Sequence, residues 1–182
     1  MRIVEEASEM PWHERVFRWF DDRNLTKGST PEKQFGKLLE EMAELYQATQ
    51  AGDQEETKDA IGDCLVVLAG MCRQLGCDWP QWERPSVNPK PYCVNELIVS
   101  IAGMPMRPVW RSAGTFGFPC QSSCVLLEQV ALASDLIVQE CMEHAWNEIK
   151  NRPGYLDPRT GVFVKNAEMP EELKQWMVEN PQ

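Results

Sequence analysis

The sequence has few basic residues, few histidines and no CxxC cysteine pair, and these absences narrow the classes of function. Lys and Arg total 18 against 28 Asp and Glu, which gives a formal charge of -10 over 182 residues. Nucleic acid duplexes and membrane surfaces are anionic, so neither is expected as the main partner. The seven cysteines sit mostly in apolar runs, where a reduced thiol behaves as a small hydrophobic group. A zinc site from Cys72 and Cys77, or from Cys120 and Cys124, therefore has little support.

Several catalytic and targeting motifs are also missing. The chain has neither a Gly-rich loop ending in GK[ST] nor a GxSxG turn, which argues against a P-loop NTPase and an α/β hydrolase. No apolar run approaches the ~18 residues of a membrane span, and the N-terminal stretch MRIVEEASEM is acidic where a signal peptide is basic and apolar. We expect a soluble, cytoplasmic protein.

Helical periodicity dominates the rest of the chain. It predicts a short helix at 11–22, longer helices at about 31–51 and 54–75, a short buried helix within 92–104, a long helix at about 122–151 and a helical turn within 170–180. Segments 77–91 and 104–121 are rich in proline and are expected to be loops, and 152–166 is expected to be extended or looped. The predicted class is all-α, a bundle of four to five helices.

Two of these helices form an acidic hairpin. Gly52 is suited to close the first helix, and Asp53 followed by Glu56 resembles a capping box for the next. The acidic residues are Glu40, Glu41 and Glu44 before the turn and Asp59 and Asp63 after it. At ~1.5 Å per residue, their distances from Gly52 place them at matching heights on antiparallel helices. The carboxylates are therefore predicted to converge.

The position of Asp63 indicates a metal. It lies within IGDCLVVLAGM, where the helix is apolar on every side, and an unpaired buried carboxylate costs several kcal/mol, roughly. Mg²⁺ prefers oxygen ligands and is commonly held by carboxylates together with substrate phosphates, and Mn²⁺ is a possible substitute. The alternative is that EExxE and DxxxD are solvated helix faces, which either motif alone would usually be.

At these residues the sequence resembles the MazG-like nucleotide pyrophosphohydrolases, within the all-α NTP pyrophosphohydrolase group. The signature of that group is EExxE followed by ExxD, here within KLLEEMAELYQATQAGDQEETKDAIGDCLVVL. The flanks, over about 15–76 and 125–166, are similar to small bacteriophage members. The resemblance implies one all-α domain over 1–182, with an unrecognised insertion at about 77–121, located in the host cytoplasm if the protein is phage-encoded.

The resemblance also implies a reaction and a set of site residues. The reaction is Mg²⁺-dependent hydrolysis of an NTP or dNTP to the monophosphate and pyrophosphate. The implied metal ligands are Glu40, Glu41, Glu44, Asp59 and Asp63, with Glu41 or Glu44 as the catalytic base. The implied phosphate-binding residues are Asn147, Lys150 and Arg152, with Lys37 either a further one or an ion-pair partner of the neighbouring acids.

One signature position departs from the group. Where ExxD begins with Glu, this chain has Ala60, and Asp59 one residue earlier is expected to replace it. This departure leaves an alternative function open, a catalytically weak helical protein that binds a nucleotide or a partner protein. Trp19, Phe20 and Phe35 are the aromatic residues nearest the acids in sequence, and they are either core residues or a stacking surface for a base. The implied assembly is a homodimer or homotetramer.

Overall fold

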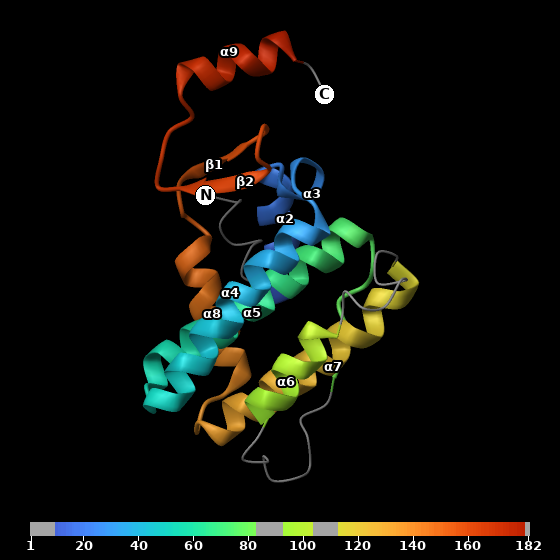
Figure 1. The fold of residues 1–182 in the computed structure, drawn as a ribbon, viewed down its shortest axis with the longest axis vertical. Helices are drawn as coiled ribbons and strands as arrows, with labels where there is room; N and C mark the ends of the chain where they lie inside the picture. The colour runs from blue at the N-terminus through green and yellow to red at the C-terminus, as the bar shows by residue number, and fades with distance from the viewer. Residues whose placement is uncertain (1–9, 83–92, 104–112, 181–182) are drawn as a thin grey trace.

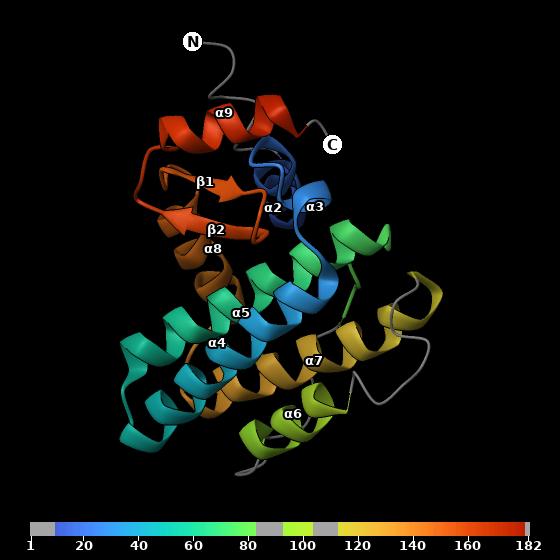
Figure 2. The same cartoon turned by 45° about the horizontal axis from the view of Figure 1, so that its top comes forward.

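The computed structural model describes residues 10–82, 93–103 and 113–180. Within these ranges lie eight helices and one two-stranded sheet (Figures 1 and 2). The elements are α2 (Trp12–Asp22), α3 (Leu25–Gly28), α4 (Pro31–Ala51), α5 (Gln54–Leu75), α6 (Cys93–Ala102), α7 (Ala113–Ala133), α8 (Val138–Ile149), β1 (Gly154–Asp157), β2 (Val162–Lys165) and α9 (Glu171–Glu179). The all-α prediction is confirmed.

Helices α4 and α5 form the predicted hairpin, and local sequence explains its ends. Thr30 caps α4, since its side chain accepts a hydrogen bond from the backbone N–H of Lys33. Gly52 ends α4 in the left-handed conformation, at φ 68°, where a side chain would be strained. The Asp53 side chain accepts from the N–H of Glu56 at 3.2 Å and starts α5. The two helices consequently run side by side in both views (Figures 1 and 2).

Helix α5 is the centre of the molecule, packed against α2, α4, α7 and α8. Almost every residue from Ala60 to Cys72 is buried, which explains why this stretch is apolar on all sides. Two glycines allow neighbours to approach closely. A Cβ on Gly62 would lie 2.5 Å from the Cys141 carbonyl oxygen of α8, and one on Gly70 would lie 2.0 Å from the ring of Phe20 in α2.

The single helix predicted at about 122–151 is wrong, because α7 and α8 are separate. Asp135 adopts a left-handed conformation at φ 55°, and the Leu136 N–H donates to the Ala131 carbonyl at 2.8 Å, which closes α7. Apolar residues recur at helical spacing on both sides of the break, so periodicity alone runs through it.

The predicted loop at 104–121 is also wrong over its last part, while 104–112 lies outside the described residues. Helix α7 begins at Ala113 and contains Pro119, although proline inside a helix costs about 3 kcal/mol. Phe116, Cys120 and Cys124 in this helix are fully buried. Burial of such side chains stabilises by about 1.5–3 kcal/mol each and therefore outweighs the cost of one proline.

Strands β1 and β2 pair antiparallel within residues 152–166, which the sequence predicts to be extended or looped. Tyr155 lies opposite Val164, and Leu156 lies opposite Phe163. Asp157 holds the connecting turn, because its carboxylate accepts from the backbone N–H and the guanidinium of Arg159. These bonds lower the pKa of Asp157 to about 2. In both views the hairpin lies above one end of α4 and α5, beneath α9 (Figures 1 and 2).

The described residues bear on two further expectations, that the cysteines are reduced and that the chain has no membrane span. Six cysteines among the described residues are free thiols, and the thiols of Cys72 and Cys120 are hydrogen-bonded to each other, with the sulfurs 3.5 Å apart. In the described ranges no helix is long and apolar enough to cross a membrane.

Candidate functional site

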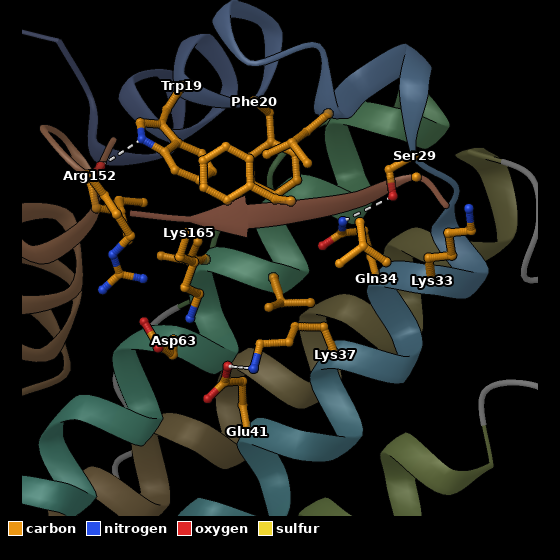
Figure 3. A pocket seen from close by; sticks show the side chains of 17 residues that line it. Trp19, Phe20, Ser29, Lys33, Gln34, Lys37, Glu41, Asp63, Arg152 and Lys165 are labelled. Carbon is orange, nitrogen blue, oxygen red and sulfur yellow. Dashed lines mark hydrogen bonds and ion pairs between the residues drawn. The ribbon is translucent and has the colours of Figure 1, made fainter. Parts of the chain in front are cut away.

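A pocket opens between the acidic hairpin, the end of α8 and the β-hairpin (Figure 3). It contains about 760 Å³ of empty space, part of which is open solvent at its mouth. The lining residues are Trp19, Phe20, Leu25, Ser29, Lys33, Gln34, Lys37, Glu41, Asp63, Val66, Val67, Ile149, Arg152, Gly161, Val162, Phe163 and Lys165. Six elements (α2, α3, α4, α5, α8 and β2) thus supply one site with an apolar wall and a charged end.

Glu41 is the innermost acid of the charged end. It is only 3% exposed, and its carboxylate lies 2.7 Å from the ammonium of Lys37, one turn earlier on α4. Burial alone would lower the pKa of Lys37, but hydrogen bonds to Glu41 and Glu40 raise it above its ordinary value. Lys37 therefore stays charged and balances one negative charge in the site.

Asp63 faces Glu41 from α5 (Figure 3). Burial, followed by the charges of Glu41 and Asp59, raises the pKa of Asp63 to about 7, while Arg152 and Lys165 oppose this shift. Such a carboxylate is not fully compensated by the protein around it. Of the five acids predicted to converge, Glu41 from α4 and Asp63 from α5 line the same pocket.

Glu44 and Glu40 lie at the edge of this group. Burial, the charge of Glu41 and a hydrogen bond with Glu41 together raise the pKa of Glu44, although its side chain is exposed. Glu40 is exposed and lies 3.0 Å from Lys37. Neither lines the pocket. Their roles as metal ligands, and that of Glu44 as a base, stay predictions.

Asp59 lies one turn from Asp63 on α5, but its carboxylate contacts a different partner. The Asp59 carboxylate lies 3.3 Å from Nε2 of His144 on α8. Asp59 is close enough to raise the pKa of Asp63, yet it does not line the pocket. Its assignment as a replacement for the missing acid at Ala60 therefore remains a prediction.

The predicted phosphate-binding residues divide into two pairs. Lys37 and Arg152 line the pocket, whereas Asn147 and Lys150 do not. The Lys150 ammonium instead donates to the Asn147 side chain at 2.6 Å on the exposed surface of α8. The site supports phosphate contact most directly for Lys37 and Arg152.

Sequence reasoning missed two lysines of the pocket, Lys33 and Lys165. Lys33 donates to the Thr160 carbonyl and so joins α4 to the β-hairpin turn. Lys165 ends β2, and its ammonium is directed toward Asp63 (Figure 3). The available signal was the alternating stretch GVFVK, because residues two apart on a strand share a face and Phe163 and Lys165 both line the pocket.

The apolar wall includes two of the three aromatic residues considered for base stacking. Trp19 and Phe20 line the pocket, while Phe35 packs against the core instead. The indole N–H of Trp19 donates to the Ile149 carbonyl at 2.7 Å, which ties α2 to the end of α8. None of the lining residues comes from the described parts of 77–121, so that segment does not build the walls of this pocket.

The acids offer the oxygen ligands that a hard divalent cation prefers, because Glu41 and Asp63 both line the pocket and the pKa values of Asp63 and Glu44 are raised. Among the described residues, however, no three His, Cys, Asp or Glu side chains are gathered closely enough to hold an ion as they stand. The carboxylates of Glu41 and Glu44 lie on adjacent turns of α4, and those of Asp59 and Asp63 lie on adjacent turns of α5. The ammonium of Lys37 forms an ion pair with one oxygen of Glu41.

The segment that carries the acids matches a known protein family. Residues 5–84 match the model of the family described as phosphoribosyl-ATP pyrophosphohydrolase. This range contains α2 to α5 and hence all five acids of the hairpin. The resemblance to the all-α NTP pyrophosphohydrolase group is confirmed.

Part of the chain is also similar to a bacteriophage protein. Over 63 residues the chain is 43% identical to an uncharacterised 18.2 kDa protein from the rep–hol intergenic region of Haemophilus phage HP1. The aligned segment is 35% of this chain and 39% of the phage protein, so the chain spans about two fifths of that relative. No solved structure matches the chain.

Proposed function

We propose that the protein is a Mg²⁺-dependent pyrophosphohydrolase that cleaves an NTP or dNTP to the monophosphate and pyrophosphate. The observation that carries the proposal is the two-sided pocket, in which cations and acids meet at one end and an aromatic wall extends from them. A nucleoside triphosphate has the same two-part character. The match of residues 5–84 to a pyrophosphohydrolase family supports the same type of reaction.

The cations at the charged end provide the phosphate contacts. Arg152 can hold a phosphate through two parallel hydrogen bonds, while Lys37 and Lys165 act as point charges from two other elements. Their arrangement on α4, β2 and the segment after α8 surrounds a phosphate chain from three sides. This placement orients the anhydride bond toward the acids.

Glu41 is the base that the geometry favours, because it lines the pocket and Glu44 does not. The proton it accepts comes from the attacking water, and Lys37 at 2.7 Å keeps the carboxylate oriented. Glu44, hydrogen-bonded to Glu41, is the second candidate. Asp63 keeps a negative charge near the same point when it is ionised.

A bound Mg²⁺, or Mn²⁺ in its place, would supply neutralisation of phosphate charge and a water of lowered pKa. The residues proposed to hold it are Glu40, Glu41, Glu44, Asp59 and Asp63.

The second candidate function is a catalytically weak nucleotide- or protein-binding module. Two observations favour it: Ala60 stands where the group has an acid, and Asp59 lies against His144 rather than in the pocket. Tight nucleotide binding without turnover is the outcome that this alternative requires.

The test is pyrophosphate release from a panel of NTPs, dNTPs and phosphoribosyl-ATP, with Mg²⁺ and with chelator. We expect pyrophosphate release that requires Mg²⁺ and that differs in rate between the nucleotides. A folded protein that binds nucleotides but releases no pyrophosphate from any of them supports the binding module instead.

A homodimer or homotetramer remains the proposed assembly. Leu39 and Tyr46 on α4 are 45% and 41% exposed, and a second copy could cover them. Light scattering at micromolar concentration is expected to give a multiple of the monomer mass, and a monomeric mass would contradict this proposal.

A further inference from the structure

A polar pair lies in the pocket at the end away from the acids. Ser29 is 5% exposed, and its hydroxyl oxygen lies 3.4 Å from Nε2 of Gln34. Both side chains line the pocket and face the same end of it, opposite Asp63 (Figure 3). Leu25 and Phe20 lie on the same lining, so the pair is set in a mainly apolar wall.

The hydrogen-bonding capacity of Gln34 is mostly unused. A carboxamide offers two N–H donors and an acceptor oxygen. Within the described part of the chain, the contact to Ser29 is the one hydrogen bond of this side chain, and at 3.4 Å it is long. A half-buried carboxamide with free donor and acceptor positions is suited to bind a ligand.

Lys33 does not compete for this role. Its ammonium donates to the Thr160 carbonyl, and a Cβ placed on Gly161 would collide with it. Lys33 therefore joins the β-hairpin turn to α4 at this end of the pocket, beside Gln34. The uncharged pair is left to determine what the end of the pocket binds.

Gln34 also lies at a suitable distance from the acids. It precedes Glu41 by seven residues on α4, which is two helical turns or about 10 Å along the axis. Lys37 lies between them, and all three line the pocket. A nucleotide with its phosphates at Lys37 and Asp63 would extend its base along the aromatic wall toward Gln34.

We propose that Gln34, oriented by Ser29, binds the hydrogen-bonding edge of the nucleobase and determines which base the enzyme prefers. The inference rests on the proposed function, since it takes the ligand to be a nucleotide. Every base edge presents donors and acceptors side by side, and a carboxamide can match such an edge with two hydrogen bonds. A site built around these bonds rejects bases that leave its polar groups unpaired.

The experiment compares kcat/KM for the four dNTPs and four NTPs in wild type, Gln34→Ala, Gln34→Glu and Ser29→Ala. Gln34→Ala is expected to lower kcat/KM for the preferred base about 10- to 100-fold and for the poorest base much less, so that discrimination shrinks. Gln34→Glu is expected to change the order of preference, because a carboxylate only accepts hydrogen bonds. Ser29→Ala is expected to lower kcat/KM for the preferred base by less than Gln34→Ala does.

Gln47→Ala is the matched control, because Gln47 is an exposed glutamine on the same helix that does not line the pocket. It is expected to leave every kcat/KM unchanged. Thermal unfolding of each variant verifies that it is folded. An equal loss for all bases in Gln34→Ala, or an unchanged order and ratio in both Gln34 variants, would overturn the inference.

A second measurement separates this inference from the proposed function. Calorimetric titration with the four nucleoside monophosphates reports base preference without turnover. If wild type releases no pyrophosphate but Gln34→Ala still narrows the preference among monophosphates, the proposed function fails and the inference stands. If turnover is normal and the preference is unaffected, the inference fails and the function stands.

Discussion

The two ends of the pocket are built from the same helix by opposite physical means. At the apolar end, Gly70 of α5 leaves space for the ring of Phe20, and burial of aromatic surface stabilises the fold. At the charged end, Gly62 of α5 leaves space for α8, and Asp63 beside it carries a carboxylate whose pKa is raised to about 7 by burial and by neighbouring acids. The first end contributes stability, while the second costs stability in the absence of a cation.

The difference indicates which part of α5 belongs to a functional site. A wall that stabilises the fold needs no ligand to explain it. An acid such as Asp63, whose raised pKa makes its ionised form costly to the fold, is explained instead by metal and phosphate binding. Variants at the two ends should therefore affect different properties.

The largest expected effect is at the charged end, in Glu41→Gln. The change keeps the shape of the side chain but removes the charge and the proton acceptor, so kcat for pyrophosphate release should fall about 10²- to 10⁴-fold. Circular dichroism should show an unchanged helix content. If the variant retains more than about a third of wild-type kcat, Glu41 is not the base and the roles of Glu41 and Glu44 must be exchanged.

A comparison of Gly62→Ala with Gly70→Ala should show that the two ends are separable. In Gly62→Ala the new Cβ meets the Cys141 backbone and the Ala145 side chain, and overpacking of this kind costs about 1–3 kcal/mol. We expect it to displace α8 and lower kcat for all nucleotides. Gly70→Ala should instead push Phe20 into the pocket and raise KM.

Urea unfolding and steady-state kinetics measure both properties. Gly36→Ala is the control, since Gly36 lies on α4 with nothing within 4 Å of an added Cβ, and it should stabilise by about 0.5–1 kcal/mol. Equal effects of Gly62→Ala and Gly70→Ala on kcat and KM would show that the two ends do not act separately.

A smaller effect is expected from Lys165→Ala. Lys165 is exposed at the end of β2 and contributes one cation to the charged end, so its loss should raise KM about tenfold with a smaller change in kcat. Lys150→Ala is the matched control, because Lys150 is exposed nearby but does not line the pocket. A larger KM increase in Lys150→Ala than in Lys165→Ala would restore the phosphate role to the end of α8.

A further expected effect is a pH dependence of the free energy of unfolding, measured in the presence of chelator. The pKa of Asp63 is about 7 in the folded protein and near 4 when unfolded, so the folded state holds its proton more tightly. Stability is therefore lost as the pH rises from about 4 through 7. Asp63→Asn should be more stable than wild type at pH 8, on the order of 1–3 kcal/mol, and nearly equal at pH 4. Urea titrations at both pH values measure this, and a variant less stable than wild type at pH 8 would contradict it.

The sequence predicted the acidic hairpin well because its signals are local. Thr30 with Pro31, Gly52 and Asp53 specify the helix ends, and Asp63 stands out as a half-buried carboxylate in an apolar helix. These same residues fix the relative heights of the acids. Glu41 and Asp63, the two predicted acids that line the pocket, could therefore be placed without long-range information.

The structure of the second half of the chain was harder to predict, because it depends on tertiary contacts rather than on local sequence. The break at Asp135 leaves the apolar spacing intact, and Pro119 is tolerated only because the side chains around it are buried. The strand that carries Lys165 is four residues long, and only its pairing with β1 directs it over the pocket. Ser29 and Gln34 are ordinary surface residues in the sequence and become a pair only when α3 and α4 are placed.

The most direct test of the two-ended site is pyrophosphate release from the preferred nucleotide by wild type and Asp63→Asn, with Mg²⁺ and with chelator. We predict metal-dependent release by wild type and a loss of at least about 100-fold in the variant, with the variant still folded. Undiminished release by Asp63→Asn would contradict the assignment of the charged end as the reaction centre.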